Sequence, residues 1–221
     1  MRYGKAAVAM ALCAAAGAAQ AAGGGLKIGT NGLGADLGWE IAPTLGARIG
    51  VSGGTLNTHV DTSDIHYDAK LKLANANLLL DWSPLGPFRI TAGIVPNSNK
   101  IDMIGTPTNG QFTLNGNTYQ ASEIGSLTGT VKPGNSAAPY LGIGYGNVWT
   151  RGINFYFDLG VMFQGSPKTT LNLTCGPAAP PGSATCNAAQ ADVAAEQQRV
   201  DDKLKKFQYY PVGSVGITIG F

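Results

Sequence analysis

Apolar and polar residues alternate along several stretches of the chain, most clearly between Ile153 and Gln164. One face of that stretch carries Ile, Phe, Phe, Leu, Val and Phe, and the other carries Asn, Tyr, Asp, Gly, Met and Gln. A period of two residues is typical of a β-strand with one apolar face. Seven stretches follow this pattern, at about 26–41, 45–60, 66–82, 88–104, 137–149, 153–173 and 208–221.

The polar faces of these stretches combine glycine with charges of both signs, whereas the apolar faces carry no charge. A soluble sheet rarely exposes a face so rich in glycine. In a membrane barrel the apolar face contacts lipid and the charges face the lumen. We therefore expect an all-β fold, an antiparallel transmembrane β-barrel. Its expected lumen charges are Asp36, Glu40, Arg48, Asp81, Arg89 and Asp158, and its expected lumen glycines are Gly142, Gly144 and Gly146.

The three tryptophans, Trp39, Trp82 and Trp149, each stand on the predicted apolar face just before a short connection. Aromatic residues at one height around a barrel form a girdle at the edge of the lipid. Short turns lie on the periplasmic side of such barrels, so this girdle would mark the inner rim. The long connections, roughly 60–66, 97–136 and 166–207, would then lie outside the cell.

The predicted number of strands is odd, although single-chain bacterial barrels use an even number. Either residues 26–41 contain a break near Asn31, where the apolar phase slips, or a further strand lies within 97–136 and another connection is misplaced. We expect eight strands.

The connection 166–207 carries the two cysteines that remain after export, Cys175 and Cys186. In an oxidising compartment two nearby cysteines most simply bond to each other. A metal site is the alternative, but further nearby cysteine or histidine ligands are missing. A helix is predicted after the disulfide, over Ala188–Phe207, as a cap on the barrel mouth or as a solvated loop helix.

The N-terminus has the features of a cleaved signal peptide. Arg2 and Lys5 precede an apolar run, and Ala19-Gln20-Ala21 is typical of a cleavage site before Ala22. Residues 1–21 would then be the signal and 22–221 the barrel. Two of the 15 basic residues leave with the signal, so 13 remain against 13 acidic ones. A neutral mature chain gives no case for nucleic-acid binding.

The last stretch, Tyr209–Phe221, alternates apolar residues and ends in an aromatic residue. With Leu78–Trp82, Pro139–Gly146 and Phe157–Val161, the mature chain resembles small proteobacterial outer-membrane barrels such as OmpX, OmpW and the transmembrane region of OmpA. The resemblance implies a gram-negative outer membrane, contact with its lipid and lipopolysaccharide, and a monomer. It implies insertion by the barrel assembly machinery, with Phe221 as part of the assembly signal. It implies no catalytic residues, metal or cofactor.

Candidate chemistry is sparse. Both histidines flank a polar segment, His59-Val60-Asp61-Thr62-Ser63-Asp64-Ile65-His66, which contains Ser, His and Asp. A catalytic triad, a divalent-cation contact and a plain solvated loop all fit this composition, and no spacing in it is diagnostic. Plain solvation is the commonest role of such a loop, so we expect no enzyme.

Two classes of function fit this barrel. A narrow passive channel or small-molecule-binding barrel is favoured by the glycine-lined lumen. A structural or surface-interaction barrel with a packed lumen and working extracellular loops is favoured because eight strands normally leave an interior that side chains just fill. A lipid A-modifying enzyme is a third, remote class.

The lumen charges discriminate between the first two classes. Antiparallel pairing across 83–87 predicts Asp81 opposite Arg89, and pairing across 42–44 predicts Arg48 opposite Gly38. Ion pairs that close across the lumen would obstruct it, whereas pairs along one wall would leave a passage. We favour the passage, because a strand with three inward glycines fills little volume.

Overall fold

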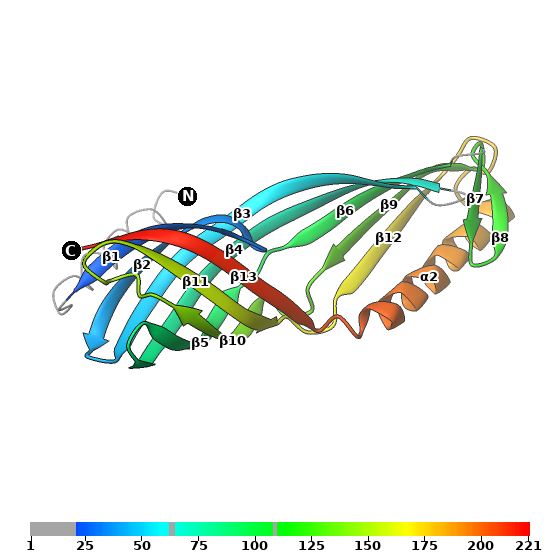
Figure 1. Ribbon diagram of the computed structural model, residues 1–221. Coiled ribbons are helices and arrows are strands. Elements are labelled where there is room, and N and C mark those ends of the chain that lie inside the picture. The colour runs from blue at the N-terminus through cyan, green and yellow to red at the C-terminus, as the bar shows by residue number, and fades with distance from the viewer. Residues whose placement is uncertain (1–20, 62–64, 108–109) are drawn as a thin grey trace, which may run out of the picture.

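The computed structural model of the chain describes residues 21–61, 65–107 and 110–221. The predicted signal peptide therefore lies outside the described residues, apart from Ala21. Both ends of the described chain lie at one end of an elongated molecule, and a long helix lies toward the other end (Figure 1).

An antiparallel ring of eight strands forms the barrel, in the order β4-β3-β2-β1-β13-β11-β10-β5, and the pairing of β4 with β5 closes it. Every pairing in the ring is antiparallel. The strands are β1 (Ala22–Gly29), β2 (Gly32–Ala42), β3 (Leu45–Asp61), β4 (Ile65–Leu85), β5 (Phe88–Pro96), β10 (Ala137–Tyr145), β11 (Gly152–Phe163) and β13 (Tyr209–Gly220).

The break predicted near Asn31 is confirmed. Residues 26–41 belong to two strands, β1 and β2, joined by a turn at Thr30 and Asn31. Gly32 follows that turn with φ +89°, a conformation that glycine adopts without steric cost. This hairpin supplies the strand that the sequence pattern left uncounted.

Beyond the ring, β3 and β4 continue into a second region, which we call the extension. There β4 pairs with β6 (Lys100–Pro107), β6 with β9 (Ile124–Lys132), and β9 with β12 (Lys168–Cys175). The extension also contains the hairpin of β7 (Gln111–Leu114) and β8 (Asn117–Gln120), and the helix α2 (Ala184–Leu204). Figure 1 shows it projecting from one end of the barrel.

The extension corrects the prediction of two long loops. Segments 97–136 and 166–207 contain β6, β7, β8, β9, β12 and α2. Likewise, 88–104 and 153–173 are each two strands rather than one, separated at 97–99 and 164–167. Asn-Ser-Asn and Gln-Gly-Ser-Pro interrupt the apolar alternation at those points, and these residue types favour turns.

The helix α2 lies against one face of the extension and along its edge. Ser183 caps its N-terminus by accepting a hydrogen bond from the Cys186 backbone N–H. The predicted disulfide, Cys175–Cys186, joins β12 to this first turn. Near the other end, Asp201 and Gln197 accept hydrogen bonds from backbone N–H groups of β12, at 2.7 and 2.9 Å. These contacts protect an edge that could otherwise pair with another strand.

The barrel and the extension have separate interiors. A cluster of buried apolar residues fills the extension between the sheet, the hairpin and α2. Its members are Phe112, Leu114, Tyr119, Ile124, Leu127, Ala189 and Val193. Among the described residues, no helix combines the length and hydrophobicity needed to cross a membrane.

Candidate functional site

The barrel interior holds a network of ion pairs that joins opposite strands of the ring. Arg48 of β3, which is 1% exposed, reaches across to Asp158 of β11 with Nη1–Oδ2 2.7 Å and Nη2–Oδ1 3.1 Å. Its Nε lies 3.0 Å from Oδ2 of Asp81 on β4, and its Nη1 lies 3.6 Å from Oδ2 of Asp36 on β2. One guanidinium therefore ties together four strands.

A second guanidinium completes the crossing. Arg89 of β5, 2% exposed, donates to Asp158 Oδ1 at 2.6 Å, and its Nε lies 3.5 Å from Asp81 Oδ1. Thr91 donates its hydroxyl to the same Asp81 oxygen at 2.5 Å. Asp158 and Asp81 are thus each shared between two arginines.

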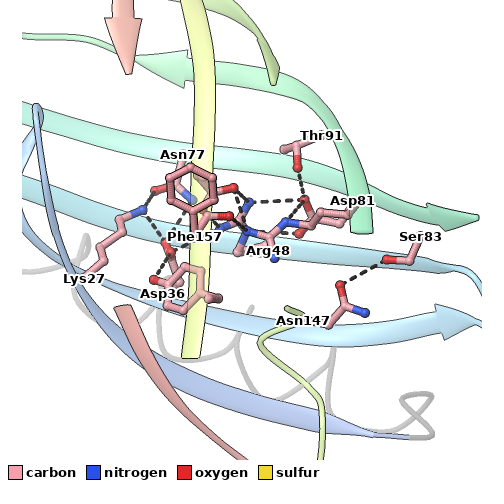
Figure 2. A network of polar contacts seen from close by, with 12 residues as sticks. Lys27, Asp36, Arg48, Asn77, Asp81, Ser83, Thr91, Asn147 and Phe157 are labelled. Atoms are coloured by element: carbon pink, nitrogen blue, oxygen red, sulfur yellow. Dashed lines mark hydrogen bonds and ion pairs between the residues drawn. The ribbon is translucent and has the colours of Figure 1, made fainter. Parts of the chain in front are cut away.

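Asp36 of β2 holds the side of the network that lies away from Arg89 of β5. Its Oδ1 accepts from Lys27 Nζ at 2.7 Å and from Asn77 Nδ2 at 3.2 Å, and its Oδ2 accepts from the Tyr156 hydroxyl at 2.8 Å. Figure 2 shows Lys27, Asp36 and Asn77 converging beside Arg48. The network contains three carboxylates, two guanidinium groups and one ammonium group, so it is formally neutral.

Aromatic side chains pack against the two arginines. The Tyr156 ring lies 5.8 Å from the Arg48 guanidinium carbon and 5.7 Å from that of Arg89, within cation–π range.

Beside the network, Lys27, Arg48 and Asn77 help to line a cavity of about 30 Å³. That volume holds about one water molecule.

The connection between β10 and β11 closes the end of the barrel near the termini. Val148 is fully buried and Trp149 is 7% exposed, and both pack against Tyr156. The prediction that Trp149 belongs to a lipid-facing girdle is wrong. The chain leaves β10 at Gly146, with φ +78°, and returns at Gly152, with φ +84°, and between them it turns into the barrel.

The lumen glycines accommodate large side chains rather than empty space. A Cβ at Gly142 would collide with the Tyr140 hydroxyl, and one at Gly144 would collide with the Arg89 guanidinium. Gly46 likewise leaves room for the Trp149 ring. Gly146 lies in the turn just described rather than on a strand face. This corrects the inference that the inward glycines of β10 leave an open passage through the lumen.

The other residues singled out from the sequence lie as follows. Trp82 is 50% exposed and Trp39 is partly exposed, and both stand on the outer face of the ring. Glu40 is partly exposed, and its side chain makes no ion pair within the described part of the chain. Phe221 is 76% exposed, and its backbone N–H donates to Ala22 O at 2.9 Å, beside the barrel seam.

The predicted register is correct across one connection and wrong across the other. Arg48 lies opposite Gly38, as predicted. Asp81, however, lies opposite Thr91 instead of Arg89, because the register shifts between Trp82 and Leu85. The shift equals two residues, so Arg89 still faces inward and reaches Asp81 diagonally.

Lys27, Asn77, Thr91 and Tyr156 belong to the network, and Tyr140 lies beside it, but none of them was among the lumen residues expected from the sequence. The sequence did carry a signal for Lys27. Its neighbours Leu26 and Ile28 lie on the apolar face, so the alternation turns Lys27 to the polar, inward face. The two tyrosines stand at polar-face positions among glycines, which in retrospect marks them as lumen-filling residues.

The polar segment around the histidines is described only in part. His59 Nδ1 lies 2.5 Å from Asp68 Oδ1, and both side chains are exposed. Residues 62–64 lie outside the described residues, so the alternatives of a triad or a cation contact there stay untested.

Comparison with solved structures places this fold among outer-membrane β-barrel proteins. CarO2 of Acinetobacter baumannii is 25% identical, with a TM-score of 0.59, over 91% of this chain and 98% of that one. CarO of the same organism is 23% identical, with a TM-score of 0.54, over 90% and 97%. No protein-family model matches the chain, and no curated protein matches it significantly.

Proposed function

We propose that the protein is an outer-membrane barrel with a closed lumen, which anchors the extension at the cell surface for interaction with other molecules. The observation that carries this proposal is the buried ion network that crosses the barrel from Arg48 and Arg89 to Asp158. The plug formed by Val148 and Trp149 closes the lumen a second time. A passive channel would need both barriers to open.

The energy of these barriers supports the proposal. Removing one partner of a buried ion pair typically costs about 3–5 kcal/mol, because the other charge stays buried and unpaired. A solute passing through the lumen would have to separate several such pairs, and it would have to displace the Trp149 ring. We therefore place the working surface on the extension.

The arrangement of connections supports an orientation with the extension outside the cell. Both ends of the described chain and the short connection between β4 and β5 lie at the barrel end away from the extension (Figure 1). Short turns face the periplasm in bacterial barrels. The disulfide in the extension also suits an oxidising environment.

Planar-bilayer recording of refolded protein tests the closed lumen. We expect no unitary conductance steps above those of protein-free bilayers, in a setup that resolves a large porin. A variant with both barriers removed, Arg48→Ser/Trp149→Ser, should show steps if it folds, which heat-modifiable gel mobility checks. Steady unitary conductance of the unaltered protein would contradict the proposal.

A second candidate function, binding of a small apolar molecule, is favoured by a cavity of about 280 Å³ at the junction of barrel and extension. Its wall includes Asn99, which is 8% exposed and whose Nδ2 has no hydrogen-bond partner among the described residues. A ligand with a hydrogen-bond acceptor would satisfy that donor. The rest of the lining is mainly apolar, with Leu71, Leu73, Ile101, Val131, Leu204, Phe207 and Tyr210, and it also includes Lys100, Lys132, Pro133, Gln164 and Pro167.

Binding of a short-chain methyl ketone, followed by ligand-observed NMR, tests this second function. Leu204→Trp should fill the cavity and abolish the signal, whereas Ile104→Trp, on the exposed outer face of β6, should leave it unchanged. Equal binding by both variants would argue that the ligand lies elsewhere.

A further inference from the structure

Four lysines form a row across four neighbouring strands at the base of the extension. Lys72 of β4 lies directly opposite Lys100 of β6, and Lys132 of β9 lies directly opposite Lys168 of β12. Ile101 pairs with Val131, so Lys100 and Lys132 come next to each other across β6 and β9. We call these four residues the lysine row.

The lysine row lies on the outer face of the extension. Val131 and Thr169 pair with each other, and the alternate residues Leu127 and Leu171 on the same face pack in the cluster that α2 covers. Lys132 and Lys168 follow and precede that pair, so the strand alternation turns them to the opposite face. Both are exposed, and the side chains of Lys72 and Lys100 are 40% and 38% exposed.

The positive charge of the row is largely uncompensated. Asp102 Oδ2 lies 2.8 Å from Lys72 Nζ and 3.1 Å from Lys100 Nζ, and these hydrogen bonds lower the pKa of Asp102 to about 2. Lys132 and Lys168 have no carboxylate within ion-pair distance in the described part of the chain. Like charges directly opposite on a sheet disfavour each other. An added anion would relieve that repulsion.

The row stands at the height where the outer surface changes from apolar to polar. Toward the barrel, β4 turns Ala74, Ala76, Leu78 and Leu80 outward, and the last two are more than half exposed. Away from the barrel, Thr130 and Thr170 occupy the same outer face. At the end of the barrel strands nearest the extension, the rings of Phe163 and Tyr209 pack edge to face, 5.6 Å apart. Aromatic residues of this kind mark the edge of a lipid layer.

We propose that the lysine row binds the phosphate groups of phosphorylated lipids in the leaflet that surrounds this end of the barrel. Lysine ammonium groups bind phosphate as point charges on flexible stems, and the stems can lie along apolar surface while the charge reaches the headgroup. Basic side chains beside a membrane attract anionic headgroups in this way. The row follows the curved wall over four strands, which matches a surface of lipid headgroups better than one small anion.

This inference goes beyond the proposed function. It uses the location of the barrel in a membrane but is independent of whether the lumen is closed. A conducting lumen would therefore contradict the proposed function and leave the proposal for the lysine row unaffected. A lysine row that binds no phosphorylated lipid would contradict this inference and leave the closed lumen unaffected.

The test compares phosphorylated and dephosphorylated lipid A. The refolded protein in uncharged nanodiscs is titrated with bisphosphorylated lipid A, and bound lipid is counted by native mass spectrometry. The variant Lys132→Gln/Lys168→Gln should bind about 25-fold more weakly, since each lysine near a membrane surface contributes about a fivefold factor. The matched control, Arg151→Gln/Lys203→Gln, removes two exposed charges elsewhere and should stay within about twofold.

Two further arms identify the ligand. Dephosphorylated lipid A should bind the unaltered protein at least as weakly as bisphosphorylated lipid A binds the double variant, because that variant keeps Lys72 and Lys100. Inorganic phosphate at the same phosphate concentration should not displace the lipid, because it lacks the acyl chains that hold the headgroup at the row. Equal binding of both lipids, an unaffected double variant, or full displacement by inorganic phosphate would each overturn the proposal.

Discussion

The barrel and the extension share one strand, β4, yet they use its two faces in opposite ways. In the barrel part, Asn75, Asn77 and Asp81 face inward and are buried, while Leu78 and Leu80 face outward and are exposed. In the extension part the order is reversed. Leu71 faces inward with its partner Ile101, and Lys70 and Lys72 face outward. The reversal falls close to Leu73 and Ala74.

This reversal follows from the solvent on the outer side. Lipid favours apolar side chains outside, so the barrel directs its charges inward and has to neutralise them there. Water favours polar side chains outside, so the extension buries an apolar cluster beneath α2 instead. The change of pattern along a continuous strand thus indicates where the lipid layer ends. Four substitutions or conditions test this contrast.

The largest effect is expected for Arg48→Met. It removes the cation that Asp36, Asp81 and Asp158 share, so the barrel should lose about 3–5 kcal/mol in free energy of unfolding. Urea titration of refolded protein, followed by heat-modifiable gel mobility, measures the loss. Lys203→Met on the exposed side of α2 is the control and should change stability by less than about 0.5 kcal/mol. Equal midpoints for the two variants would contradict the role of the network.

A charge placed on the outer face should be costly only in the barrel. Leu80→Lys should destabilise the protein by about 2–4 kcal/mol in a lipid bilayer, because the new charge faces lipid. Ile104→Lys, on the outer face of the extension, should cost less than about 0.5 kcal/mol, because that side chain faces water. Unfolding of both variants in liposomes gives the comparison. If Ile104→Lys were as costly as Leu80→Lys, the lipid would extend over the extension.

Removing the disulfide should affect the extension alone. Cys175→Ser/Cys186→Ser opens a loop closed between residues 11 apart, so the extension should lose about 2–3 kcal/mol. Limited proteolysis should then cut α2 and β12 faster, while the barrel keeps its heat-modifiable mobility. Loss of that mobility would mean that the two regions fold as one unit.

The smallest effect concerns pH. Hydrogen bonds from Tyr119, Asn115 and Asn117 lower the pKa of Asp192 on α2. A lowered pKa means that this stabilisation is fully present above the unfolded value of about 3.9, and is lost as pH falls through the folded value. The helical far-UV circular dichroism signal should therefore weaken below about pH 4. Asp192→Asn should reduce that pH dependence, and an unchanged profile would contradict the role of Asp192.

The alternation of residues predicts the barrel well, because lipid imposes one rule on every outer face. Arg48, Asp81, Arg89 and Asp158 were correctly assigned to the interior by that rule alone. Trp149 was not, because its direction depends on a turn with positive φ at Gly146 and Gly152, which glycine permits but does not require. A pattern within one strand identifies a face, and it does not identify what reaches that face from across the lumen.

The extension was harder to predict for a related reason. Its strands have apolar residues inside and threonine, lysine and asparagine outside, which is the reverse of the barrel. β6, β9 and β12 therefore lack the continuous apolar outer face that identifies a membrane strand. The register error at Asp81 has a local cause, since the shift between Trp82 and Leu85 lies in backbone geometry. The unpredicted extension strands and the register error at Asp81 have one cause in common. Each depends on contacts with other parts of the chain, which the sequence of a single strand does not specify.

The continuous pairing of β3 with β4 has a mechanical consequence. All 17 residues of β3 pair with β4 without a register shift, from Leu45 opposite Trp82 to Asp61 opposite His66. The ladder therefore passes from barrel to extension with no hinge between them. A partner that pulls along the extension pulls β3 and β4 together, so it loads in shear, many at once, the hydrogen bonds that join β3 to β2 and β4 to β5. The extension then acts as a stiff lever, and it transmits force directly into the barrel wall.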